Sequence, residues 1–232
     1  MKRFFLLCMI VLLLLAACGQ APDTQDADTD FTVTQQQLFP PEQAFDVEFE
    51  AFYEEFTAAV RGKDTRFIEG ILDDEIMSSF GGVPGKPYFY DYWAYMDLWA
   101  KLGEIIALGG VYYQAGEYHQ ANRGKCFVAP YTFAELDGDA FEQYAVIGKD
   151  VPAHEKKSAR SKVIASLDYN ILEFHNSDEF RKKGPEDFVS VTLPTGETGY
   201  VQRKYLRSPT DYRLCIEQKD GEWKLLWLVA GD

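Results

Sequence analysis

The sequence predicts an α+β fold, with helices dominating the first part of the mature chain and strands the second. Apolar side chains between residues 45 and 60 recur at the spacing of a helix that is buried along one face. From residue 126 onward, short apolar runs alternate with turn residues, which is typical of a small β-barrel. A helix-rich domain, residues 44–135, therefore either precedes the barrel, residues 140–208, or is interrupted by it. Residues 209–232 are predicted to form a C-terminal hairpin that can return to the first domain.

The first 18 residues have the composition of a secretory signal. Lys2 and Arg3 form a positively charged start, and an apolar run without charges extends from Phe4 to Leu15. Small residues close the segment at Ala16 and Ala17. The run is well short of the roughly 20 apolar residues that a membrane-spanning helix needs. We therefore expect the segment to be removed after export.

The end of this segment resembles the lipobox of bacterial lipoproteins. Leu15, Ala16 and Ala17 are followed by Cys18, the position at which that family is cut and acylated. The resemblance implies that Cys18 carries lipid and anchors the chain in a membrane, facing the extracytoplasmic side. Gly19 stands where an aspartate commonly retains lipoproteins in the inner membrane, so the outer membrane is expected if the source is Gram-negative. Residues 19–43 are polar and acidic and are predicted to be a flexible tether.

The charge of the chain excludes one class of partner. The full chain of 232 residues has a formal charge of −14. Removing residues 1–18 takes away two basic residues and no acid, so the mature charge is about −16 (21 basic against 37 acidic residues). Nucleic acid is excluded because phosphate binding needs a basic surface. The same balance argues against the body lying on anionic lipid and weakly favours partners that carry amines.

The helix-rich part is built from three predicted segments. The first carries Phe45, Phe49, Phe52 and Phe56 on one face and ends near Gly62. Asp64 or Thr65 caps a short second helix, and a third helix is predicted from Pro87 to Gly110. The rings of this third segment either pack in the core, which we favour, or form a platform for sugar. An acidic triplet, Asp73 to Glu75, is interpreted as a solvated helix end.

The strand-rich part contains two cysteines and a clear turn. Cys126 and Cys215 both lie in strand-like runs and remain after the signal is removed, so a disulfide between them is a candidate in an oxidising compartment. Buried free thiols are the alternative. Asp220 and Gly221 separate two apolar runs and predict a tight hairpin.

The segment from residue 150 to 174 resembles the first half of a bacterial SH3-like (SH3b) domain. Residues 199–206 resemble the closing strand and turn of that family, including Gly199, which is expected to allow a tight bend. The sequence departs from the family at Pro152, His154, Lys157 and Ala165, and His154 is expected in a surface loop. The apolar matches are the following: Val151, Val163, Ile164, Leu167, Ile171, Leu172, Val201 and Leu206.

The resemblance implies a shallow, ring-lined groove. Its candidate residues are Tyr144, Tyr169, Tyr200 and Tyr205. Members of the family bind cell-wall peptides or other envelope partners, so the function expected here is non-catalytic binding or scaffolding in the cell envelope. The competing interpretation is that these tyrosines only fill the barrel.

A fainter resemblance connects the first helices and the last hairpin to a cone-shaped, NTF2-like domain. Such a domain can enclose a pocket, so the alternative function is an envelope enzyme that uses an Asp or Tyr as acid or base. No HExxH, GxSxG or GxGxxG motif occurs, and none of His119, His154 and His175 has the spacing of a metal ligand. No metal or cofactor is therefore predicted.

Overall fold

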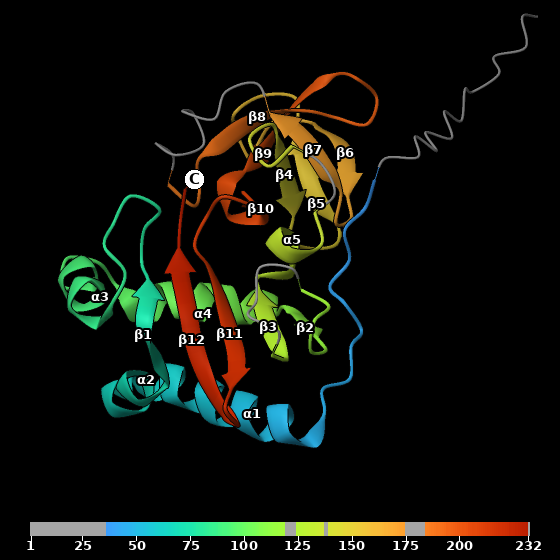
Figure 1. Cartoon of the computed structure of the whole chain (residues 1–232). Coiled ribbons are helices and arrows are strands. Elements are labelled where there is room, and N and C mark those ends of the chain that lie inside the picture. Colours follow the sequence, from blue (N-terminus) through green and yellow to red (C-terminus); the bar gives the residue numbers. More distant parts are fainter. Residues whose placement is uncertain (1–35, 119–123, 137–138, 175–183, 232) are drawn as a thin grey trace, which may run out of the picture. The chain divides into compact units, whose positions relative to one another are not determined.

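The computed structural model describes residues 36–118, 124–136, 139–174 and 184–231. Within these ranges the chain forms helices and two β-sheets, so the predicted α+β class is confirmed (Figure 1). Residues 33–232 belong to one compact unit. The predicted signal segment, Cys18, His119 and His175 lie outside the described residues. No helix among the described residues is long and apolar enough to cross a membrane.

The first sheet combines strands from both ends of the described chain. Its order is β1-β12-β11-β3-β2, and β1 pairs with β12 in parallel while the other pairs are antiparallel. Asp220 and Gly221 have positive φ angles of 52° and 84°, which confirms the tight turn between β11 and β12. The strands are β1 (Leu72–Met77), β2 (Val111–Tyr113), β3 (Cys126–Ala129), β11 (Arg213–Lys219) and β12 (Glu222–Val229).

Four helices pack against this sheet, and a short fifth follows β3. The helix α1 ends at Gly62 as predicted, and Lys63 then adopts a left-handed conformation with φ 55°. Asp64 caps α2 by accepting hydrogen bonds from the backbone N–H groups of Arg66 and Phe67. The helices are α1 (Val47–Gly62), α2 (Thr65–Ile71), α3 (Lys86–Trp93), α4 (Leu98–Leu108) and α5 (Tyr131–Ala134).

Three predictions for this region are wrong in detail. The single helix predicted over residues 87–110 is two helices, because the chain leaves α3 after Trp93 and restarts at the N-cap Asp97. The acidic triplet lies in β1 rather than at a helix end, and Asp73 pairs with Lys219 of β11 at 2.6 Å. Residues 36–43 are not part of a free tether, since the Gln43 side chain makes two hydrogen bonds of 2.6 Å to the backbone of Tyr112.

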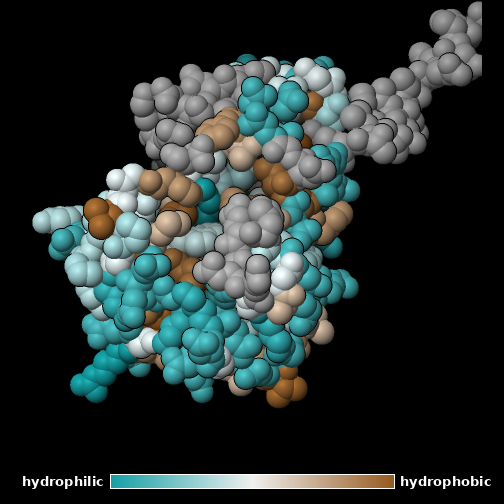
Figure 2. All heavy atoms as spheres, viewed as in Figure 1, coloured by the Kyte–Doolittle hydropathy of each residue, from teal (hydrophilic) through white to brown (hydrophobic). Residues whose placement is uncertain are grey.

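The five-stranded sheet has a separate apolar cluster on each face. One face joins α1–α4 through stacked rings, with Phe49 lying 4.7 Å from Tyr112 and 4.9 Å from Trp223 between ring centroids. The other face carries a smaller cluster that includes Cys126, Cys215 and Trp227. The side of the molecule seen in Figure 2 is largely hydrophilic, and its exposed hydrophobic residues are scattered.

The second sheet lies between β3 and β11 in the sequence. Its order is β10-β4-β7-β8-β9-β5-β6, and β10 and β6 are its edges, so the predicted barrel is not closed. The strands β11 and β12 return to the first sheet. The seven strands of the second sheet are therefore an insertion in the sequence of the first. The strands are β4 (Gln143–Val146), β5 (Val151–His154), β6 (Val163–Leu167), β7 (Ile171–Phe174), β8 (Phe188–Thr192), β9 (Thr198–Gln202) and β10 (Leu206–Arg207), with a 3-10 turn at Arg203–Tyr205.

Candidate functional site

The four tyrosines predicted to line a groove lie on different elements. Tyr144 is 1% exposed and belongs to the core of the seven-stranded sheet, so its assignment to a groove is wrong. Alternation along β4 turns its side chain inward. Tyr169 lies at the β6–β7 turn with its ring against Phe39. Tyr200 on β9 and Tyr205 in the 3-10 turn are half-buried.

Two clefts meet at the start of α4, and both include Asp97 and Trp99. The larger, of about 450 Å³, lies between the C-terminal half of α1 and α4. The smaller, of about 280 Å³, lies between α2, α3 and the start of α4. Trp99 is half-buried and lines both clefts. This pair of clefts is the candidate binding site.

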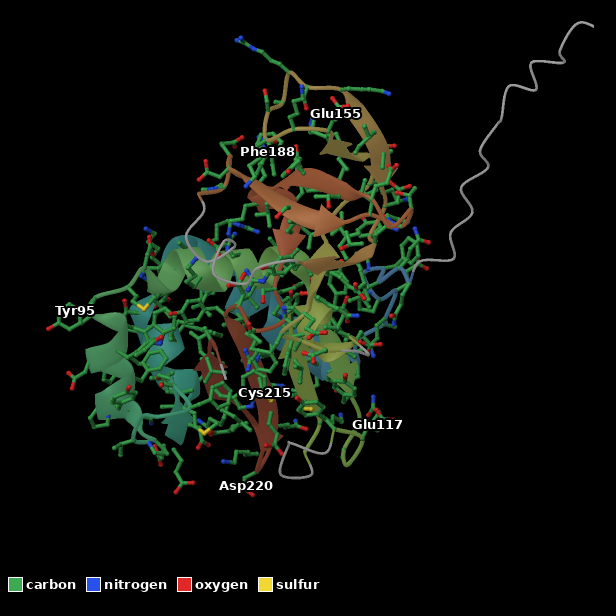
Figure 3. All side chains as sticks on the ribbon, turned by 90° about the horizontal axis from the view of Figure 1, so that it is seen from above. Tyr95, Glu117, Glu155, Phe188, Cys215 and Asp220 are labelled. Atoms are coloured by element: carbon green, nitrogen blue, oxygen red, sulfur yellow. The ribbon has the colours of Figure 1, made fainter. Side chains whose placement is uncertain are left out.

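Exposed side chains gather at the rim of the clefts because the helix breaks there. Tyr95, between α3 and α4, is 92% exposed, and Figure 3 shows its side chain pointing away from the ribbon. Tyr90 and Met96 are also exposed and line the smaller cleft. The Tyr212 hydroxyl donates a hydrogen bond of 3.1 Å to the sulfur of Met96, which lies in the segment between α3 and α4. A residue that precedes β11 therefore positions the break between α3 and α4.

The two clefts carry charged groups of both signs. Asp97 accepts a hydrogen bond from the backbone N–H of Ala100, so its carboxylate is already used to start α4. Arg61 and Lys63 line the larger cleft, and neither forms an ion pair with another described residue. Rings beside free cations suit recognition of extended polar chains. Within the described residues, no group of His, Cys, Asp and Glu side chains could hold a metal ion.

One cluster of ionisable groups was missed by the sequence analysis. Asp46 accepts hydrogen bonds from the Tyr112 hydroxyl at 2.6 Å and from Lys125 Nζ at 2.8 Å, and its other oxygen caps α1 through the N–H of Phe49. The sequence signal for this cluster was Asp46 itself, because an acidic residue directly before a helical pattern is typical of a helix N-cap. Its hydrogen bonds to Lys125 and Tyr112 hold the pKa of Asp46 well below its usual range. Burial and the bond to Asp46 raise the pKa of Tyr112.

This cluster stabilises the start of a helix and is not prepared for acid–base catalysis. A general base needs a pKa near the working pH, and the pKa values of both Asp46 and Tyr112 are shifted away from neutrality. Both carboxylate oxygens of Asp46 are also occupied by hydrogen-bond donors from the chain itself.

Cys126 and Cys215 are buried free thiols, so the predicted disulfide is not formed in this structure. The register pairs Cys126 with Glu217 and Cys215 with Val128, which places the two cysteines diagonally on neighbouring strands. A hydrogen bond between the thiols and burial raise the pKa of Cys215 well above its usual range. The Cys215 thiol therefore stays protonated at neutral pH. Disulfide formation in an oxidising compartment stays a prediction.

His154 is also placed differently from its prediction. It lies in β5 and is 5% exposed, whereas a surface loop was expected. Its Nδ1 lies 3.2 Å from the backbone oxygen of Ser161, and its ring packs edge-on against Phe188. The residue therefore stabilises the base of the β5–β6 hairpin.

Comparisons with known proteins give no relative of this chain. No family model, no curated protein and no solved structure matches it.

Proposed function

We propose that this chain is a lipid-anchored protein of the bacterial cell envelope that binds a cell-wall peptide or another envelope protein without catalysing a reaction. Its anchor is the lipid on Cys18. The seven-stranded sheet is the part that we assign to the SH3-like class, on the residues named above. The pair of clefts at Trp99 is its main binding site.

The observation that carries this proposal is the combination of groups around Trp99. A large ring lines both clefts, exposed Tyr90 and Met96 extend the surface, and two cations without an ion pair to another described residue lie at the larger cleft. Such rings supply contact area at a low cost in conformational entropy. The only carboxylate common to both clefts, that of Asp97, is used as a helix cap. The site therefore has the features of a binding surface.

The proposal is tested by tryptophan fluorescence with soluble cell-wall fragments released by a muramidase. Trp93, Trp223 and Trp227 are each less than 9% exposed, so Trp99 supplies most of the emission that acrylamide can quench. We expect the fragments to protect this emission from quenching. Trp99→Ala should weaken retention of the protein on fragment-coated beads at least tenfold. Phe141→Ala removes a ring that is 51% exposed and lies outside both clefts, and should have no effect.

A third variant separates the two candidate surfaces. If Tyr200→Ala abolishes retention and Trp99→Ala does not, the site lies on the seven-stranded sheet, as the sequence predicted, and the assignment to the clefts is wrong. If the wild-type protein binds neither the fragments nor a purified envelope protein, the proposed binding function is wrong.

A further inference from the structure

The loop between β5 and β6 concentrates positive charge in an otherwise acidic protein. Residues 155–162 contain one acid, Glu155, against four bases. All four basic side chains belong to exposed residues. This local excess contrasts with a mature charge of about −16 and was not apparent from the net charge. The bases are Lys156, Lys157, Arg160 and Lys162.

The loop has a defined conformation. The Lys156 N–H donates to Ser161 Oγ at 3.1 Å, and the same hydroxyl donates to the Lys156 backbone oxygen at 3.2 Å. The Ser158 N–H donates to that backbone oxygen as well, at 2.6 Å. At the base of the loop, the Glu155 N–H donates a hydrogen bond of 2.9 Å to the Lys162 backbone oxygen and joins the ends of β5 and β6. The Ser158 Oγ accepts a hydrogen bond from the Arg160 N–H at 3.2 Å. The side chains of Ser158 and Ser161 thus fold the loop locally, which lowers the entropy lost on binding.

The base of the loop is anchored in the sheet. The buried ring of His154 contacts the backbone oxygen of Ser161 and packs on Phe188. Lys157 Nζ lies 5.6 Å above the centroid of the Tyr200 ring. The remaining cations, Lys156, Arg160 and Lys162, form no ion pair with another described residue. The loop therefore presents charge that the rest of the described fold does not neutralise.

The loop projects from the seven-stranded sheet and lies outside both clefts at Trp99. Figure 3 shows Glu155 at the outer end of the seven-stranded sheet, far from Cys215 in the five-stranded sheet. Neither of the two clefts at Trp99 includes a residue of this loop. A cationic tip of this kind fits a broad anionic surface better than it fits a small anion, which needs to be enclosed.

The chain that leads to the anchor contacts the fold at the other end of β6 from the basic loop. The Ile171 N–H donates to the Gln36 oxygen at 2.9 Å, and the Leu38 N–H donates to the Tyr169 oxygen at 2.8 Å. These contacts lie at the β6–β7 turn, one strand length from the basic loop. Residues 19–35 can span at most about 60 Å when fully extended. The bilayer that holds Cys18 is therefore within reach of the loop.

We infer that the β5–β6 loop binds the phosphate headgroups of anionic lipids in the membrane that holds the anchor. The inference depends on the proposed anchor, since a lipid on Cys18 keeps the loop close to the bilayer. Each Lys or Arg near an anionic surface strengthens binding about fivefold. The acidic body is repelled by the same surface, so the loop also determines which side of the protein faces the membrane.

The experiment uses the mature chain, residues 19–232, without lipid, so that its result does not depend on acylation. Co-sedimentation is measured with vesicles of phosphatidylcholine containing 30% phosphatidylglycerol (about a third of the lipid carrying charge) and with vesicles of phosphatidylcholine alone. We expect binding only to the anionic vesicles, with loss of binding as salt shortens the Debye length from about 10 Å to a few ångströms. The triple variant Lys156→Gln, Arg160→Gln, Lys162→Gln should reduce binding at least tenfold.

A second triple variant is the matched control. Arg61→Gln, Lys63→Gln, Arg66→Gln removes the same number of exposed cations that are unpaired among the described residues, from the α1–α2 junction. It should bind the vesicles like the wild type. Equal losses in the two triple variants would show a non-specific effect of net charge and would overturn the inference. Binding to soluble polyphosphate without binding to anionic vesicles would also overturn it, because the partner would then be an anionic polymer.

Discussion

Asp46 shows how much one side chain can organise at the start of a helix. It caps α1 and holds Tyr112 and Lys125, which come from β2 and from the residue before β3. The cap fixes the end of α1, and the other two bonds fix α1 against the edge of the five-stranded sheet. Charge-assisted hydrogen bonds of this kind are stronger than neutral ones.

Replacing Asp46 should destabilise the protein in a pH-dependent way. Asp46→Ala removes the helix cap and the hydrogen bonds to Tyr112 and Lys125. It should lower the free energy of unfolding by about 2 kcal/mol. Asp46→Asn keeps the shape and should cost about 1 kcal/mol, because only the charge is lost. The pKa of Asp46 lies below its usual 3.8 in the folded state, so its contribution is full above about pH 5 and is lost as the pH falls further.

Urea unfolding at several pH values measures both effects. The stability difference between the wild type and Asp46→Asn should shrink as the pH drops from 5 toward 2, to about zero below both pKa values. A difference that is constant over this range would show that the charge of Asp46 does not stabilise the fold.

Cys18 is the residue on which the proposed location depends. Cys18→Ala removes the thiol that would form the thioether to lipid, so the full-length chain should accumulate as an unprocessed or soluble precursor. Several acyl chains give firm membrane binding where one chain is marginal. Membrane fractionation with labelled fatty acid checks the result. Continued labelling of the alanine variant in the membrane fraction would contradict the prediction.

At the scale of elements, local signals predicted α1, the cap of α2 and the β11–β12 turn, since each depends on a few adjacent residues. The break between α3 and α4 was missed, although Asp97 caps α4 locally; the contact of Tyr212 with Met96 joins this break to a residue far away in the sequence. The sequence placed the rings of this region in a core helix, and the clefts exist only because the break exposes some of them. The candidate site could therefore not be predicted from local periodicity.

Two other predictions, for Gly199 and Asp73, were also wrong because they depend on contacts with distant parts of the chain. Gly199 was expected to allow a tight bend, yet it lies inside β9, where a Cβ atom would approach the Leu193 side chain to 2.8 Å. Its role is close packing, which sequence patterns do not reveal. The interpretation of Asp73 as part of a solvated helix end was wrong, because its partner Lys219 comes from the opposite end of the chain.

The pair of β3 and β11 leads to a prediction about oxidation. Cys126 and Cys215 are buried on neighbouring strands in diagonal register, so we expect a disulfide when the chain is exported through an oxidising compartment. The chain-entropy estimate for a loop of about 90 residues is roughly 4 kcal/mol. The measured gain should be smaller, because the cysteines are diagonal and bond formation must shift the strands.

Alkylation under denaturing, non-reducing conditions tests this prediction. Protein from the envelope should resist the reagent at both cysteines and should gain two labels after reduction. Cys126→Ser should leave Cys215 reactive once the protein is unfolded. Labelling of both cysteines without prior reduction would show that the free thiols of this structure are also the native state in the envelope.

At the scale of the whole molecule, the apolar clusters are separate although the chain crosses between the sheets twice. Both clusters of the five-stranded sheet consist only of residues before 140 and after 208. The cluster of the seven-stranded sheet consists only of residues 144–206. The sequence left open whether the second part follows or interrupts the first. The strand order shows the interruption, since Ala129 at the end of β3 pairs with Leu214 near the start of β11.

This separation predicts that residues 140–208 can be removed. Replacing them with a Gly/Ser linker of about 10 residues keeps every buried residue of the clusters around the five-stranded sheet. It removes the contacts of the buried Arg207 with Glu104 and the backbone oxygen of Tyr212, and the ring contact of Phe39 with Tyr169. The shortened chain should retain its near-ultraviolet circular dichroism and unfold in one cooperative transition at a lower temperature. A state with far-ultraviolet signal but no near-ultraviolet signal would show that the two sheets fold only as one unit.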